Sequence, residues 1–289
     1  MEKKSNIQWY PGHMTKAKRQ MQEDIRLVDL LIEMLDARVP SSSRNPDINE
    51  LGKGKYRLVL LNKADLSDER KNRQWTQYFE KQGIQALLLD ARTRNQIKDI
   101  TAAIREICAE KSERDRRRGI LNRPVRAMVA GIPNVGKSTL INSFAGRAVT
   151  KTGNKPGVTK GKQWIRLNKE VELLDTPGIL WPKFDDPMAG ERLSMIGSIR
   201  DEILNLEEPA LSLLDYLRQE YPKALATRYG IDEDGQTVTI LSRIAVSRGC
   251  FRKGEELDYG KAARLLLDDF RQGKLGRITL EYPETDKTD

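Results

Sequence analysis

Five short apolar runs, each about the length of a β-strand, recur along the first part of the chain. They lie at residues 30–36, 56–61, 85–89, 125–130 and 171–174, and polar or loop-forming residues follow each of them. Nearly continuous runs of this kind are typical of parallel strands that are buried on both faces. The pattern therefore predicts five buried strands.

The segments between these runs show helical spacing. Helices are predicted over 15–28, 70–82 and 95–111, and residues 114–118 are expected to form a charged linker to the fourth strand. Strands that alternate with helices favour an α/β fold with a doubly wound, mostly parallel sheet. In such folds ligands bind at the C-terminal ends of the strands.

Beyond about residue 190 the apolar residues keep helical spacing. The positions that carry this pattern are Leu211, Leu213, Leu214, Leu217, Ala262, Ala263, Leu265, Leu266, Leu267 and Phe270. We therefore expect an N-terminal arm over 1–14, an α/β domain over 15–185, and a small, mainly helical domain over 195–289. The helical domain is expected to bind RNA.

The chain is strongly basic, with a formal net charge of +9 and a pI of about 9.4. A surplus of this size favours a polyanionic partner, either nucleic acid or anionic lipid. No apolar run is long enough to span a membrane, and we recognise no signal or transit peptide. Cys108 and Cys250 lie far apart and are expected to be buried thiols in a reducing compartment, so we expect a cytoplasmic protein.

Basic residues are densest over 145–169, which contains seven Lys or Arg residues and no Asp or Glu. We expect this segment and the 114–118 linker to contact RNA phosphates, although a merely solvated loop remains the alternative.

The stretch 131–139 reads Gly-Ile-Pro-Asn-Val-Gly-Lys-Ser-Thr and fits the phosphate-loop pattern. A predicted strand precedes it, and helical spacing follows it up to Gly146, which is the context that this motif requires. Backbone N–H groups of such a loop surround the phosphates, while Lys137 can bridge the β- and γ-phosphates and Ser138 can ligate Mg²⁺. The residues expected at the nucleotide are Asn134, Val135, Gly136, Lys137, Ser138 and Thr139.

A second motif, Asn62-Lys63-Ala64-Asp65, follows the second predicted strand and fits N-K-x-D. The Asp65 carboxylate matches the N1–H and N2–H donors of guanine, whereas adenine offers an acceptor at N1. The Lys63 stem would cover the base, and Asn62 would tie this loop to the phosphate loop. The pattern predicts GTP and GDP as ligands and disfavours an ATPase or kinase.

Asp175 and Gly178 form a D-x-x-G motif after the last predicted strand. Asp175 is expected to hold Mg²⁺ through water, and the Gly178 N–H to contact the γ-phosphate. Thr159 either completes the Mg²⁺ shell or is a solvated loop threonine.

These motifs occur in an unusual order, with N-K-x-D before the phosphate loop and D-x-x-G. The chain therefore resembles the circularly permuted GTPases, and the joined ends of the ordinary domain would lie around 95–124. The Trp-Tyr-Pro-Gly-His-Met stretch at 9–14, the Asp-Ala-Arg-Val-Pro stretch at 36–40 and the helical C-terminal part are similar to the permuted GTPases of late bacterial 50S subunit assembly. This resemblance covers nearly the whole chain.

The resemblance implies a GTPase that binds rRNA and the 50S precursor in its GTP state and is released after hydrolysis stimulated by the particle. It also implies base contacts from the loop at Asp90 and Ala91, where the Ala91 N–H would reach guanine O6. Asp90 stands where many GTPases have serine.

The position after Gly178 is Ile179, which cannot orient the attacking water as the glutamine of Ras does. Hydrolysis by the chain alone should therefore be slow. The resemblance implies His13 as the catalytic group beside Lys137, although a lone histidine is often structural. It also implies K⁺ at Asn134, which could instead bond to the neighbouring switch backbone.

Two further readings stay open at this stage. One is a GTP-gated RNA-binding module in which hydrolysis is incidental, and the other is a membrane-surface GTPase, which no lipidation motif supports. We expect a monomer with no membrane association, in which a γ-phosphate contact at Gly178 re-aims the domain over 200–289.

Overall fold

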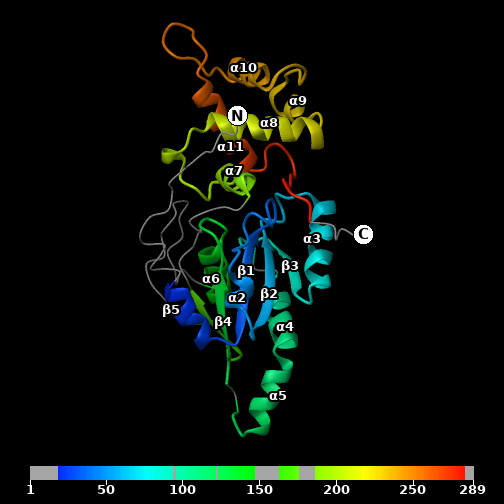
Figure 1. Cartoon of the computed structure of the whole chain (residues 1–289), viewed down its shortest axis with the longest axis vertical. Coiled ribbons are helices and arrows are strands. Elements are labelled where there is room, and N and C mark those ends of the chain that lie inside the picture. The colour runs from blue at the N-terminus through cyan, green and yellow to red at the C-terminus, as the bar shows by residue number, and fades with distance from the viewer. Residues whose placement is uncertain (1–18, 94–95, 122, 147–162, 176–185, 284–289) are drawn as a thin grey trace.

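The computed structural model describes residues 19–93, 96–121, 123–146, 163–175 and 186–283. A six-stranded sheet occupies the middle of the molecule, most of the C-terminal helices lie at one end, and α5 (Ala109–Arg117) projects at the other (Figure 1). The sheet order is β3-β2-β1-β4-β6-β5. The mostly parallel α/β fold predicted from the sequence is confirmed.

All five predicted strands are present. They are β1 (Leu30–Asp36), β2 (Tyr56–Asn62), β3 (Gln85–Leu89), β4 (Val125–Ala130) and β6 (Val171–Asp175), and they pair in parallel. The phosphate-loop strand β4 lies between β1 and β6, so strands from before and after it in the chain flank it on either side.

The sequence pattern missed β5 (Gln163–Arg166), which pairs antiparallel with β6 at the edge of the sheet. Only four residues long, it lies within a basic segment, and an edge strand needs no continuous apolar run. The Arg126 guanidinium lies over the Trp164 ring, 5.2 Å from its centre. Pairing with β6, rather than a local sequence pattern, therefore determines that β5 forms a strand.

Alternate residues of β1 pack against opposite layers. Leu30 and Ile32 share a core with the apolar faces of α4 (Ile97–Ile107) and α6 (Lys137–Ala145). On the other face, Leu31 packs with the helical residues before η1 (Ile25–Leu27) and with α2 (Ile48–Leu51), and Leu35 packs with α3 (Glu69–Lys81). Both faces of the sheet are therefore covered, which explains the nearly continuous apolar strands.

The prediction of a charged linker over 114–118 is wrong, because Arg114 to Arg117 belong to the helix α5 (Ala109–Arg117). The predicted 95–111 helix is two helices that meet at Cys108, whose φ of −97° and ψ of 12° interrupt the regular spiral. Glu, Lys and Arg are good helix formers, and an ion pair between the buried residues Lys111 and Asp115, 2.8 Å apart and one turn from each other, stabilises α5. This run of charged residues therefore forms a helix rather than a loop.

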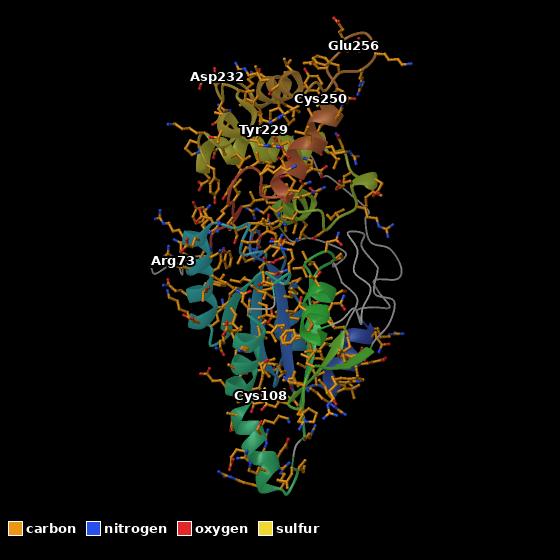
Figure 2. The ribbon with its side chains drawn as sticks, turned by 180° about the vertical axis from the view of Figure 1, so that it is seen from behind. Arg73, Cys108, Tyr229, Asp232, Cys250 and Glu256 are labelled. Carbon is orange, nitrogen blue, oxygen red and sulfur yellow. The ribbon has the colours of Figure 1, made fainter. Side chains whose placement is uncertain are left out.

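The C-terminal helices are α7 (Pro187–Met195), η2 (Asp201–Ile203), α8 (Glu207–Glu220), α9 (Ala224–Tyr229), α10 (Thr237–Ser247) and α11 (Tyr259–Arg271). Their leucines form a core that is continuous with the α4 and α6 side of the sheet. Figure 2 shows Tyr229 and Cys250 within this helical part and Cys108 near the opposite end of the molecule. None of the described helices has the length and apolar character needed to cross a membrane.

Residues after α11 return to the α/β part. The Ile278 N–H donates to the Leu66 carbonyl at 3.0 Å, and the Leu280 N–H donates to the Arg38 carbonyl at 2.7 Å. The Glu281 carboxylate, which is 3% exposed, accepts hydrogen bonds from the N–H groups of Ser41 and Ser42. The helical part is thus fastened to the loop that follows β1.

Candidate nucleotide site

A cavity of about 880 Å³ lies where the C-terminal ends of β1, β2 and β3 meet the phosphate loop. Residues from α11 and from the segment after α7 line it too, and among its lining residues are Asn62, Lys63, Asp65, Asp90, Ala91, Asn134, Gly136 and Thr139. Its position agrees with the rule that doubly wound sheets bind ligands at strand carboxyl ends. The structure therefore brings the N-K-x-D loop, the 90–92 loop and the phosphate loop to one pocket.

Two glycines of the phosphate loop are fixed by close contacts. A Cβ at Gly131 would lie 2.5 Å from the Met34 carbonyl oxygen, and a Cβ at Gly136 would lie 2.4 Å from Asn62 Nδ2. Gly136 also has a φ of +107°, outside the range that other residues readily adopt. This tight loop delivers the chain into α6, whose N-terminus favours anions.

Lys137 is buried, and its ammonium donates to the carbonyls of Gly131 and Ile132 at 3.0 and 2.8 Å. The cation is therefore held against the phosphate loop, where it can face the phosphates of a nucleotide. Ser138 and Thr139, partly buried, occupy the first turn of α6 beside it.

Asn62 joins the two halves of the pocket, as the sequence predicted. Its Nδ2 donates to the Val135 carbonyl at 2.6 Å, and its Oδ1 accepts from the Ala91 N–H at 2.9 Å. The Ala91 N–H, which the resemblance assigns to guanine O6, donates to Asn62 in this structure, and its contact with O6 stays a prediction. One buried side chain thus ties the base loops to the phosphate loop.

Lys63 leaves β2 with a φ of +61°, and its ammonium lies 2.9 Å from Asp36 at the end of β1. Asp36 also receives a two-pronged contact from Arg38, at 2.9 and 2.8 Å. Burial alone would raise the pKa of the Asp36 carboxyl, but Arg38 and Lys63 lower it well below its usual value. The carboxylate therefore stays ionised and orients the lysine at the base loop.

Asp65 is partly exposed at the mouth of the pocket, and Arg92 lies against it at 2.6 Å. The same guanidinium contacts Asp90 at 2.9 Å and lowers the pKa of that carboxyl by hydrogen bonding. The N-K-x-D pattern did not reveal Arg92. A guanine base that bonds to Asp65 would replace the arginine as the partner of that carboxylate.

The helical part forms the outer wall of the pocket through direct contacts with the phosphate loop. Asn134 Nδ2 donates to the Gly197 carbonyl at 2.8 Å, and the Ser198 hydroxyl donates to the Pro133 carbonyl at 3.0 Å. Asn134 itself has a φ of +60°. No sequence motif signals these contacts, because the partners lie more than sixty residues apart in the chain.

Several predicted site residues lie outside the described residues. They are His13, Thr159 and Gly178, together with the side chain of Asp175. The Asp175 backbone ends β6 and pairs with Val129 of β4. Among the described residues no cluster of three or more His, Cys, Asp or Glu side chains could hold a metal ion.

A phosphate loop after β4, an N-K-x-D loop after β2 and the reversed order of the two in the chain define a circularly permuted P-loop GTPase. The family model described as "50S ribosome-binding GTPase" matches residues 126–233, which begin at the phosphate-loop strand. The N-K-x-D segment lies before that match, as the permutation requires.

Full-length relatives place the chain more closely. It is 47% identical to ribosome biogenesis GTPase A of Bacillus cereus over 96% of this chain and 94% of that one. Identity to the Thermotoga maritima protein of the same name is 31%, over 96% and 95% of the two chains. The chain belongs to the ribosome biogenesis GTPase A family.

Solved structures agree with this assignment. A GDP-bound structure of TM YlqF matches with a TM-score of 0.67 and 26% identity, over 92% of this chain and all of that one. GNP-bound YlqF from T. maritima matches with a TM-score of 0.65 and 28% identity, over 93% and 99%. Both matches agree with the assignment of the chain as a GTPase.

Proposed function

We propose that this GTPase is an assembly factor for late maturation of the bacterial 50S ribosomal subunit. It binds the rRNA and proteins of the 50S precursor in its GTP state and leaves after the particle stimulates hydrolysis. The names of its relatives and of the matching family model support this proposal. The main observation behind the proposal is that the C-terminal helical part forms a wall of the nucleotide pocket. The same part of the chain can therefore contact the nucleotide site on one side and the ribosomal particle on the other.

The pocket residues fit a Mg²⁺–GTP complex. Ser138 supplies a hard hydroxyl oxygen at the start of α6, and we assign Thr159 and Asp175, through water, to the same ion. Mg²⁺ would neutralise charge on the β- and γ-phosphates. Asn134 is assigned to K⁺ through its amide oxygen, while the Gly178 N–H contacts the γ-phosphate.

Within this proposal the site residues act in two groups. The base is held by Lys63, Ala64, Asp65, Asp90 and Ala91, and the phosphates are held by residues 134–139. Asn62 links the first group to the phosphate loop. His13 orients the attacking water once the particle orders the N-terminal arm, because Ile179 cannot.

The basic segment 145–169 and the helical domain over 195–289 contact rRNA, and the γ-phosphate contact at Gly178 re-aims that domain between the two nucleotide states. The protein acts as a monomer in the cytoplasm and does not bind membranes.

The test is the rate of GTP hydrolysis with and without purified 50S subunits, in K⁺ and in Na⁺. We expect slow hydrolysis alone, stimulation by the particle, and faster turnover in K⁺. The His13→Ala variant should keep its affinity for the particle and lose the stimulation. If particles do not change the rate for the wild-type protein, the proposal fails, and GTP-dependent binding without stimulation would indicate a GTP-gated RNA-binding module. If His13→Ala keeps full stimulation, His13 is not the group that orients the water.

A further inference from the structure

A second cavity, of about 280 Å³, lies at the edge of the sheet opposite to the nucleotide pocket. α5 forms one wall, and residues next to the N-terminal ends of β1, β2 and β4 form the others. In Figure 1 α5 ends at the pole farthest from α8 and α10. We name this cavity the α5 pocket, and its cationic residues are Lys55, Lys111, Arg114, Arg118 and Arg123.

Two carboxylates also line the α5 pocket, and cations within it already neutralise both. The Lys111 ammonium, which is buried, lies 2.8 Å from Asp115 and 3.4 Å from Asp29. Arg123 lies 3.8 Å from Asp29 and 4.0 Å from Asp115. The internal ion pairs therefore hold the wall in place, and the remaining cations of the pocket add a positive surplus.

That surplus comes from arginines at the rim. Arg114 and Arg118 are exposed, and within the described part of the chain neither guanidinium forms an ion pair or a hydrogen bond with another side chain. Next to them, Ile120 and Leu121 are 42% and 72% exposed. A single phosphate ion would leave these aliphatic groups in water, whereas a macromolecule lying across the rim would cover them.

We propose that the α5 pocket and its rim bind the phosphate backbone of RNA, an inference that rests on the proposed function. Guanidinium groups bind phosphate oxygens through paired, charge-assisted hydrogen bonds, and four of the five residues from Arg114 to Arg118 are arginines. An acidic protein surface is the competing occupant. Arginine is concentrated here and both carboxylates of the pocket are already paired, which favours RNA.

The position of the α5 pocket gives it a distinct role. The nucleotide pocket lies at the C-terminal ends of the strands and the α5 pocket at their N-terminal ends, with the sheet between them. The helical part contacts the phosphate loop directly, but α5 lies at the other end of the molecule (Figure 1). Binding at α5 is therefore a nucleotide-independent anchor, which keeps the protein on its RNA while the helical part responds to GTP.

The test uses full-length protein that carries Arg114→Glu together with Arg118→Glu. The matched control is Arg73→Glu with Lys81→Glu, because both residues are exposed on α3 and the net charge changes equally. Figure 2 shows Arg73 on the outer side of α3, away from the α5 end. Affinity is measured for purified 50S subunits and for rRNA extracted from them, with a GTP analogue and with GDP, over a salt series.

We expect the α5 variant to bind both RNA samples at least about 10-fold more weakly, by the same factor in both nucleotides, with a salt slope lower by about 2. Its GTP hydrolysis without RNA should equal that of the wild type. Equal affinity of the α5 variant and the α3 control would overturn the inference, as would a loss confined to intact subunits, which would indicate a protein partner. If wild-type protein binds neither sample, the proposed function fails before the variants are compared.

Discussion

Replacement of Asp36 by asparagine should test how the base loop is fastened to the helical part. Asp36 is fully buried and contacts Lys63 of the N-K-x-D loop on one side and Arg38 on the other. Arg38 is 1% exposed, and its guanidinium lies 5.3 Å from the centre of the Phe270 ring in α11. It also donates to the Arg271 carbonyl at 3.4 Å. A single carboxylate thus connects the nucleotide pocket with α11.

The expected loss follows from the burial of these charges. Asp36→Asn keeps the shape of the side chain and leaves Arg38 buried without a counter-ion, a change that costs about 3–5 kcal/mol in other buried pairs. A domain is usually stable by only about 5–15 kcal/mol, so this loss should be plain in urea unfolding. As a control, Glu113→Gln removes an exposed pair with Arg116 and Arg117, and should cost about 0–1 kcal/mol.

A double-mutant cycle measures whether the charge pair is the cause. Arg38→Met removes the buried cation, so Asp36→Asn in that background should cost at least about 1 kcal/mol less than in the wild type. Affinity for GDP, read with a fluorescent analogue, should fall in Asp36→Asn because Lys63 loses its anchor. Additive costs in the cycle, or a cost as small as that of Glu113→Gln, would refute this reasoning.

Two further substitutions test the loop geometry and the C-terminal tail. Gly136→Ala should abolish binding of a fluorescent GDP analogue, because its Cβ would lie 2.4 Å from Asn62. The control Gly146→Ala should bind normally, since Gly146 also has a positive φ, of +67°, but no heavy atom lies within 4 Å of its Cβ position. Tight binding of the analogue by Gly136→Ala would contradict the geometry. Burial raises the pKa of the Glu281 carboxyl in the folded protein, so this carboxyl ionises at lower pH in the unfolded chain. The free energy of unfolding should therefore fall as pH rises from about 4.5. Glu281→Gln should flatten this decline in urea unfolding at a series of pH values, and an unchanged pH profile would show that Glu281 does not cause it.

Local patterns were enough to predict most of the sheet and the two nucleotide loops. Strands such as β1, β3 and β4 were predicted with their observed ends, because each is a short apolar run bounded by polar residues. The role of Asn62 as a tie between the loops also followed from its motif, and both of its hydrogen bonds are observed. Cys108 and Cys250 are buried, as expected.

Local patterns failed where a partner distant in the chain decides the structure. β5 forms because β6 offers it an edge, and α5 is a helix although its charge favoured a linker. Arg92 at Asp65 and the contacts of Asn134 and Ser198 have no motif of their own.

The amino-acid sequence by itself determined the class of this protein, since the chemistry of phosphate and guanine demands particular residues at fixed short spacings. Only the tertiary structure decided that the helical part forms a wall of the nucleotide pocket and that Asp36 links it to the base loop. Those contacts join residues that lie far apart in the chain, and their energies depend on burial, which no short stretch of sequence specifies.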